Sequence, residues 1–223
     1  MRKLSLTLLV LLATGLVSAR ATTFSLFEYG LNIDGDITTP GDPVPGEVNL
    51  SGFDLTTGLG SIDVSLGGAG AHYLALFVDH EIDEAVNTFF NEYGDAAGTP
   101  SAGLSWEIDE PGFVFGDIYD NFLVGALDSS NGVPPGSEED VSMALGWDFI
   151  LNPGEVALIN ISVGPTAPAG GFYLEQTDPD SDASVFFSTG LHIRGGEAVP
   201  DGGSSVLLLG LALAGAAAFR LRR

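Results

Sequence analysis

The sequence predicts an all-β protein: an antiparallel, jelly-roll-like β-sandwich with one short helix, lying between two apolar terminal segments. The first observation is a series of short apolar or alternating runs separated by turn residues, which is typical of sandwich strands. The second is the turn-forming content, with 31 Gly and 12 Pro, and no long segment of helical period. The third is a hydrophobic content of 45%, enough to form a core in a chain without cysteine.

The first 21 residues are predicted to be a secretory signal peptide. Arg2 and Lys3 precede an apolar run from Leu4 to Val17, and cleavage is possible after Ala19 or Ala21. The run is shorter than the roughly 20 residues of a membrane span, so an uncleaved anchor is the less favoured alternative. The expected partners of this segment are the Sec translocon and signal peptidase.

Residues 22–198 are predicted to form one exported domain. Ten runs are candidate strands: Thr23–Ile33, Val48–Leu55, Ser61–Leu66, Ala71–Val78, Leu104–Ile108, Phe113–Phe115, Val141–Leu151, Val156–Val163, Gly171–Leu174 and Val185–Ile193. The run Val156–Val163 is apolar on both faces, which indicates a central strand. Apolar residues at spacings of three and four predict the helix over Glu81–Tyr93, ending before Gly94.

The charge distribution separates this domain from the ends of the chain. The chain has 7 Lys and Arg against 30 Asp and Glu, a net charge of −23. Arg194 is the only basic residue between Thr22 and Val199, whereas Asp201 is the only acidic residue outside that span. Nucleic acid is therefore excluded as a partner, because its phosphates require neutralisation by cationic side chains.

The C-terminal segment, residues 199–223, has three parts. The residues Val199, Pro200, Asp201, Gly202 and Gly203 come first, followed by an apolar stretch from Val206 to Phe219 and a basic end with Arg220, Arg222 and Arg223. The uncharged run that begins at Gly202 and ends at Phe219 is just long enough for a transmembrane helix. The terminal arginines would stop it in the membrane on the cytoplasmic side, with the acidic domain outside.

This tail resembles the PEP-CTERM sorting signal in its VPD-type variant. Asp201 stands in place of the commoner Glu, and Gly202 and Gly203 replace the usual Pro and its successor. The resemblance implies that an exosortase processes the chain, so that it is held transiently in the inner membrane and then delivered to the cell surface or outside the cell. A permanent anchor without processing is the alternative.

A second resemblance lies in the exported domain. The stretches Phe77–Gly94, Trp106–Asp120 and Met143–Phe149 are similar to a module in the exported regions of other PEP-CTERM proteins. The resemblance implies export and a β-rich fold, and it implies no activity.

Two acidic clusters suggest a calcium site, because Ca²⁺ takes six to eight oxygen ligands in flexible geometry. The first contains Asp79, Glu81, Asp83 and Glu84, and the second contains Glu107, Asp109, Glu110, Asp117 and Asp120. The candidate ligands are Asp79, Glu81, Asp83, Glu84, Asp117 and Asp120. The alternative is a solvated acidic surface. His80 lies between two carboxylates but has no second histidine four residues on, so a solvated side chain is expected rather than a zinc ligand.

No motif in the sequence predicts an enzyme: it has no Gly-x-Ser-x-Gly elbow, Walker loop or dinucleotide fingerprint. The expected function is a structural or adhesive protein of the cell surface or extracellular matrix, with calcium as the candidate stabilising ion. An alternative is a module that binds extracellular polysaccharide through exposed aromatic residues drawn from Phe77, Trp106, Tyr119 and Trp147. A secreted hydrolase is less favoured, and it predicts two carboxyl groups of shifted pKa facing each other in a cleft.

Overall fold

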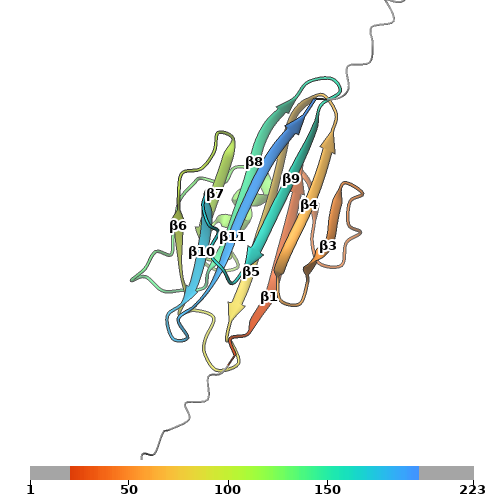
Figure 1. Cartoon of the computed structure of the whole chain (residues 1–223). Helices are drawn as coiled ribbons and strands as arrows, with labels where there is room; N and C mark the ends of the chain where they lie inside the picture. The colour runs from red at the N-terminus through yellow and green to blue at the C-terminus, as the bar shows by residue number, and fades with distance from the viewer. Residues whose placement is uncertain (1–20, 196–223) are drawn as a thin grey trace, which may run out of the picture.

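The computed structural model describes residues 21–195, which form a sandwich of two antiparallel sheets (Figure 1). The predicted signal peptide and sorting tail lie outside these residues. Within residues 21–195, no helix has the length and hydropathy needed to cross a membrane. All strands of both sheets and all members of both apolar clusters belong to this part of the chain, so it forms a complete folding unit.

The first sheet has five strands in the order β2-β1-β5-β8-β7. The strands are β1 (Phe24–Ile33), β2 (Asp36–Thr38), β5 (Gly70–Ile82), β7 (Leu104–Asp109) and β8 (Ser142–Leu151). The central β5 pairs with β1 on one side and with β8 on the other, and its register places Asp79 opposite both Glu28 and Ser142. A β-bulge between Leu26 and Glu28 leaves Phe27 without a partner in the ladder.

The second sheet has six strands in the order β3-β4-β9-β11-β10-β6. The strands are β3 (Val48–Asp54), β4 (Leu59–Gly67), β6 (Tyr93–Ala97), β9 (Val156–Gly164), β10 (Tyr173–Asp178) and β11 (Ala183–Arg194). The predicted central strand is confirmed, because β9 lies between β4 and β11.

The main core lies between the two sheets and follows strand alternation. In β5 the side chains of Leu74, Leu76 and Val78 are buried against those of Ile159 and Ile161 in β9, as members of one apolar cluster. Each fully buried side chain of this kind contributes about 1.5–3 kcal/mol. A one-residue slip of β5 would bring its charged face into this core, so the hydrophobic pattern determines the register.

A second, smaller apolar cluster covers the outer face of the five-stranded sheet. Helix α1 (Ile118–Val124) buries Ile118 and Phe122 against Phe77 of β5, and Phe122 lies 5.8 Å from Phe77 between ring centroids. Gly30 of β1 lies directly under this contact, and a Cβ atom there would be 2.7 Å from the Phe122 ring. The helix therefore packs directly on the sheet backbone at this point.

The structure corrects three sequence predictions. The helix predicted over Glu81–Tyr93 is wrong, because β5 continues to Ile82 and an irregular loop leads from there to β6. Phe113–Phe115 is an exposed loop rather than a strand. The short strands β2 and β6 were not predicted, because their sequences carry no apolar alternation.

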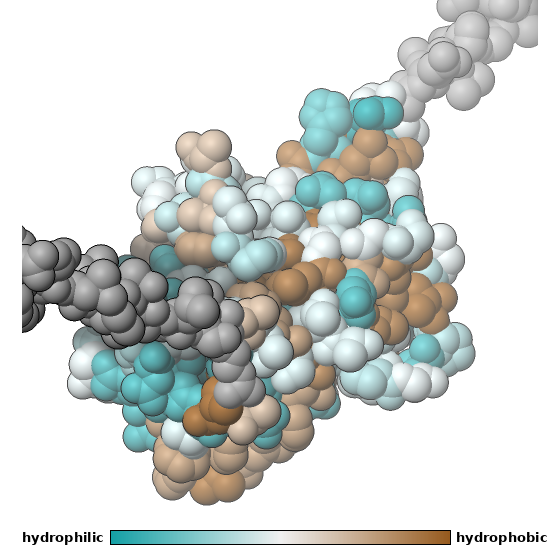
Figure 2. All heavy atoms as spheres, turned by 60° about the horizontal axis from the view of Figure 1, so that its bottom comes forward, coloured by the Kyte–Doolittle hydropathy of each residue, from teal (hydrophilic) through white to brown (hydrophobic). Residues whose placement is uncertain are grey.

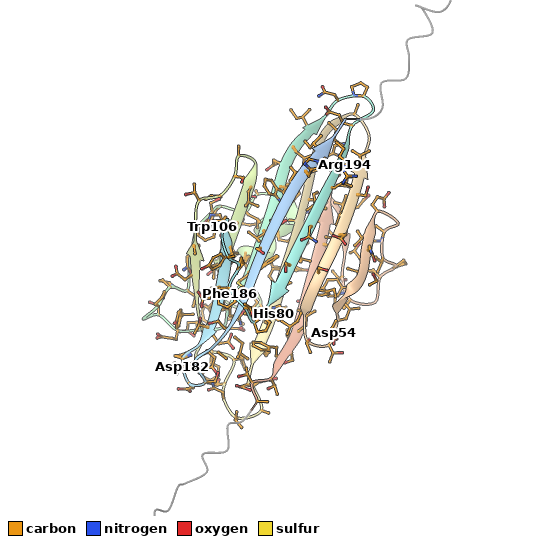
Figure 3. All side chains as sticks on the ribbon, viewed as in Figure 1. Asp54, His80, Trp106, Asp182, Phe186 and Arg194 are labelled. Carbon is orange, nitrogen blue, oxygen red and sulfur yellow. The ribbon has the colours of Figure 1, made fainter. Side chains whose placement is uncertain are left out.

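The two ends of the sandwich are distinct. Figure 3 shows Asp182, at the turn between β10 and β11, at one end and Arg194, the last residue of β11, at the other. Strand β5 ends at Ile82 opposite Phe24, the first residue of β1, at the Asp182 end. The described chain therefore ends at the opposite side of the sandwich from the loop that follows β5.

Candidate functional site

Three carboxyl groups meet on the outer face of the five-stranded sheet. Asp79 and Glu81 are two residues apart in β5, so both point to this face. Asp140 lies just before β8, and the pairing of β8 with β5 brings it beside them. Each residue offers one oxygen atom, and the three atoms lie within 4.8 Å of one another. We call Asp79, Glu81 and Asp140 the carboxylate triad.

The triad is buried and incompletely hydrogen-bonded. Asp79 is 1% exposed and Glu81 is 7% exposed. Asp79 Oδ1 and Glu81 Oε2 are buried and make no hydrogen bond, and neither does the neighbouring Ser142 Oγ. An unsatisfied buried polar atom costs about 1–3 kcal/mol. Within residues 21–195, these oxygen atoms have no hydrogen-bond partner.

The electrostatics of the triad disfavour the charged form of all three carboxyl groups. Burial raises the pKa of Asp79 well above its usual range, and the charges of Asp140 and Glu81 raise it further. Burial and the charge of Asp140 raise the pKa of Glu81 to about 7. Burial, together with Glu110 and Glu139, raises the pKa of Asp140 to about 6. No basic side chain lines this site to offset the repulsion.

The triad forms the floor of a pocket of about 500 Å³ with an apolar rim. The lining residues are Phe27, Asp79, Glu81, Glu84, Phe89, Phe90, Glu110, Pro111, Phe113, Val114, Phe115, Glu139 and Asp140. The rim comes from the β1 bulge and from the loops that follow β5 and β7. Figure 2 brings this end of the molecule forward and shows hydrophobic surface exposed next to hydrophilic surface.

The predicted calcium ligands are only partly brought together. Asp79 and Glu81 belong to the triad, and the exposed Glu84 lines the same pocket. Asp83 does not take part, because its Oδ1 accepts hydrogen bonds from the backbone N–H and the hydroxyl of Thr23, at 2.7 and 3.0 Å. This contact ties the start of β1 to the loop after β5.

The remaining predicted ligands lie apart from the triad. Asp117 is near Glu107 and Asp109 in a second acidic group, whereas Asp120 is exposed on the first turn of α1. In this group Glu107 accepts hydrogen bonds from Asn121 and from the Asp128 N–H, and Asp109 accepts one from the Asp117 N–H at 2.9 Å. Because these hydrogen bonds already satisfy the buried Glu107 carboxylate, a cation would stabilise this second acidic group less than the triad.

The sequence signal for Asp140 was present but not specific. It ends an acidic run, with Glu138 and Glu139, directly before a predicted strand. Only the β5–β8 pairing shows that this run reaches Asp79.

His80 is buried rather than solvated, which corrects the sequence prediction. Its side chain is fully buried on the opposite face of β5 from the triad, and its Nε2 donates a hydrogen bond to the Gly58 carbonyl at 3.1 Å. Burial lowers its pKa to about 4, so the ring is neutral. The neutral His80 side chain therefore packs at the edge of the core and links β5 to the turn that contains Gly58.

The predicted row of sugar-binding aromatic residues is not exposed. Phe77 is completely buried and Trp147 is 5% exposed, with its Nε1 donating to Thr189 Oγ1 at 3.1 Å. Trp106 and Tyr119 are half-buried. The exposed aromatic side chains are instead the five phenylalanines of the pocket rim.

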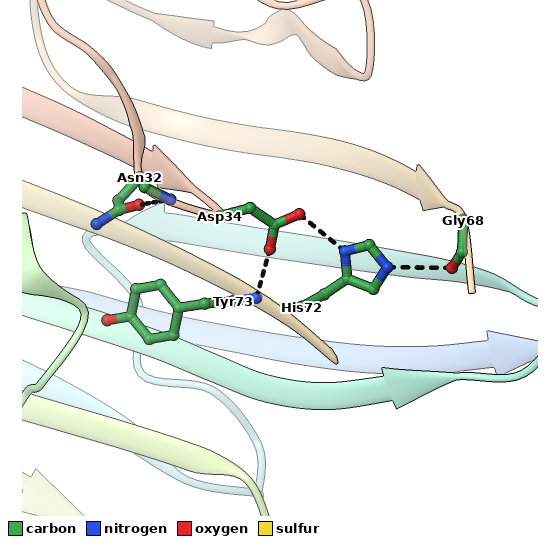
Figure 4. A network of polar contacts seen from close by, with 6 residues as sticks. Asn32, Asp34, Gly68, His72 and Tyr73 are labelled. Atoms are coloured by element: carbon green, nitrogen blue, oxygen red, sulfur yellow. Dashed lines mark hydrogen bonds and ion pairs between the residues drawn. The ribbon is translucent and has the colours of Figure 1, made fainter. Parts of the chain in front are cut away.

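Two other hollows in the described part of the chain do not contain a group of buried carboxyl groups without hydrogen-bond partners. A cleft of about 490 Å³ contains Asp34 and His72, whose contact is 2.8 Å, while the other ring nitrogen of His72 lies 3.0 Å from the Gly68 carbonyl (Figure 4). Both ring nitrogens are thus engaged, and the Asp34 contact raises the pKa of His72. The other hollow is an open groove of about 710 Å³ on the six-stranded sheet, where Asn160 Nδ2 donates a hydrogen bond to Asp63 Oδ1 at 2.8 Å.

The acidic pocket is therefore the candidate functional site, and no known protein guides its interpretation. In comparisons with protein-family models, curated proteins and solved structures, nothing matched this chain.

Proposed function

We propose that this chain is a non-enzymatic, exported β-sandwich of the cell surface or extracellular matrix, with a structural or adhesive role, that binds one calcium ion at the carboxylate triad. The carrying observation is the pair of buried, unpartnered oxygens, Asp79 Oδ1 and Glu81 Oε2, beside Asp140. Export and sorting rest on the terminal segments and their resemblance to PEP-CTERM proteins.

The donor set favours calcium over transition metals. All three ligands are carboxylates and no His or Cys is among them, which suits a hard cation. Calcium accepts irregular coordination and mono- or bidentate carboxylates, so three such groups can supply much of its shell. Magnesium fits less well, because it demands near-octahedral geometry and retains several waters.

Titration of calcium into residues 21–195 is expected to show saturable binding of one ion per chain. Asp140→Asn removes a triad charge and is expected to weaken binding at least tenfold, whereas the exposed Asp36→Asn, with the same change in net charge, is expected to leave it unchanged. Isothermal titration calorimetry measures both. The calcium proposal fails if the wild-type domain gives no saturable signal, or if Asp140→Asn binds as the wild type does.

Export and sorting are tested separately in the full chain. Replacement of Pro200 and Asp201 by Ala is expected to block removal of the tail by an exosortase, so that a larger, inner-membrane form accumulates. Immunoblotting of membrane, surface and medium fractions measures this. Unchanged size and location would rule out the sorting proposal without affecting the calcium proposal.

A secreted glycoside hydrolase is the second candidate, since carboxyl groups of raised pKa in a pocket are what a general acid requires. Paired catalytic carboxyl groups stand about 5–5.5 Å apart in retaining enzymes and farther apart in inverting ones. The triad atoms lie within 4.8 Å, which suits a shared ion better. Hydrolysis of an aryl glycoside that is abolished by Asp140→Asn would favour the enzyme.

A further inference from the structure

When its carboxyl groups are ionised, the pocket that contains the triad offers no side-chain hydrogen-bond donor to a ligand. Six of its lining residues are carboxylic acids, and the other seven are Phe, Val and Pro. Carboxylates only accept hydrogen bonds, and the Phe, Val and Pro side chains neither donate nor accept them. Among the described residues, Arg194 is the only Lys or Arg, and it lies at the opposite end of the sandwich.

The carboxyl groups outside the triad are placed around the pocket mouth. Glu84, Glu110 and Glu139 line the same pocket as the triad. Glu84 acts electrostatically on Glu81, and Glu110 and Glu139 act on Asp140. A calcium ion at the triad would offset two of the pocket's six potential negative charges, so the mouth would still attract cations and repel anions.

The rim provides exposed aromatic surface next to these charges. Phe27 and Phe113 meet edge to face with ring centroids 6.2 Å apart, and Phe89 and Phe90 do so at 5.0 Å. Phe27 is 64% exposed and Phe115 is 66% exposed, although large apolar side chains normally avoid water. Phe27 reaches the rim because the β1 bulge removes it from the ladder.

We infer that the mouth of this pocket binds an organic ammonium ion carried on an apolar body. A primary ammonium group has three donors and no acceptor, which matches a ring of carboxylates without competing donors. The adjoining hydrocarbon would cover the phenylalanine rings, and the cation would gain from their π faces. The same chemistry occurs in a free alkylamine and in a lysine flanked by apolar residues in a peptide.

Besides the exposed carboxylates, the triad contributes two buried hydrogen-bond acceptors to this pocket. Asp79 and Glu81 are more than nine-tenths buried, and each directs an unpartnered oxygen into this pocket. Neutral polyols fit less well, since each hydroxyl brings an acceptor for which the pocket side chains offer no donor. The ammonium proposal does not require the calcium ion, because without the ion an ammonium group can donate to the triad oxygens as well as to Glu84, Glu110 and Glu139.

Calorimetric titration of residues 21–195 with n-hexylamine at pH 8 tests the inference, with n-hexanol as the uncharged counterpart. Hexylamine is expected to bind saturably and at least tenfold more tightly than hexanol. A short peptide with one lysine between apolar residues, compared with its glutamine version, distinguishes the peptide source from the free amine. Saturable binding of either cationic probe supports the inference, and the tighter one identifies the source.

Matched variants locate the binding site. Glu110→Gln and Phe113→Ser are each expected to weaken hexylamine binding about five- to tenfold, whereas Ile150→Ser, an equally exposed apolar position outside the pocket, is expected to have no effect. Titrations in EDTA and in calcium keep the two proposals distinguishable, because amine binding without calcium binding overturns only the calcium proposal.

Three outcomes would overturn the inference. The first is no saturable binding of any cationic probe. The second is equal affinity for hexanol and hexylamine, which would identify a purely apolar surface. The third is binding to phosphatidylcholine vesicles without amine binding, which would identify the rim as a lipid-contacting surface.

Discussion

Asp79→Asn is expected to stabilise the calcium-free protein and, at the same time, to abolish its response to calcium. The wild-type carboxyl group must either carry a charge while 99% of its surface is buried, or take up a proton, because burial and the charges of Asp140 and Glu81 raise its pKa. The amide keeps the shape without the charge and can donate to a neighbouring oxygen. We expect a gain of about 1–3 kcal/mol at pH 8 in EDTA.

The calcium response of the wild type sets the scale for this comparison. An ion that binds only the folded state adds about 2.7 kcal/mol at a hundredfold excess over its dissociation constant. For a domain of this size, that corresponds to an increase in Tm of about 5–10 °C. Asp79→Asn is expected to show almost none of it.

Differential scanning calorimetry of residues 21–195 in EDTA and in calcium measures both effects. Asp36→Asn provides the control for charge alone and should retain the full calcium shift. A variant Asp79→Asn that melts below the wild type in EDTA, yet still gains several degrees from calcium, would contradict the role assigned to the triad.

The calcium-free wild type is also expected to lose stability as the pH rises from about 6.5 to 8.5, and Glu92 is one of the carboxyl groups responsible. This side chain is 1% exposed, and burial raises its pKa to about 8, although hydrogen bonds from Gln176 and from the Ile82 N–H oppose the shift. The native state therefore holds a proton that the unfolded chain has released above pH 4.5. Stability falls wherever the native state binds more protons.

The expected loss between pH 6.5 and 8.5 is on the order of 2 kcal/mol for Glu92 alone, since each pKa unit corresponds to about 1.4 kcal/mol and the native carboxyl group deprotonates within this range. The raised pKa values of Glu81 and Glu107, each about 7, act in the same direction. His80 acts oppositely between about pH 4 and 6.5, because burial lowers its pKa and the unfolded chain binds the additional proton. Above pH 6.5 His80 no longer contributes, whereas His72, whose pKa is raised by its hydrogen bond to Asp34, adds to the loss.

Urea unfolding at several pH values in EDTA measures this dependence. Glu92→Gln keeps the shape and the acceptor for the Ile82 N–H, and it is expected to flatten the profile. A wild-type profile that is flat between pH 6.5 and 8.5 would show that these carboxyl groups are not shifted as their burial implies.

The sandwich could be predicted because alternation along a strand is a local property. Nine of the ten predicted runs coincide with or overlap strands of the structure. The helix prediction failed for a physical reason. Val86, Phe89 and Phe90 have helical spacing, but they are exposed at the pocket rim, whereas Ile82 belongs to β5. Spacing alone cannot distinguish the buried face of a helix from apolar residues on a loop.

The true helix carries weaker signals that are visible in retrospect. Ile118 and Phe122 are four residues apart and buried, and Gly125 ends the helix in the left-handed conformation. Seven residues form about two turns, too few for periodicity to stand out. Its stability comes from packing on Phe77, which sequence patterns do not reveal.

The candidate site was predictable only in part, because it depends on strand pairing. Asp79 and Glu81 share a face by alternation, but Asp140 joins them only through the β5–β8 register. Asp83 lies outside the triad, because its backbone, at a φ of 54°, leaves the strand and its carboxylate accepts hydrogen bonds from Thr23.

The position of the pocket at the end opposite Arg194 has a mechanical consequence. If a partner pulled at the pocket while the C-terminal side were held, the load would run along β5 and β11 rather than across them. Ladder hydrogen bonds lie perpendicular to the strands, so such a force shears many of them at once instead of opening them one by one. The strands are thus oriented to resist tension applied between the pocket and the C-terminal side of the domain.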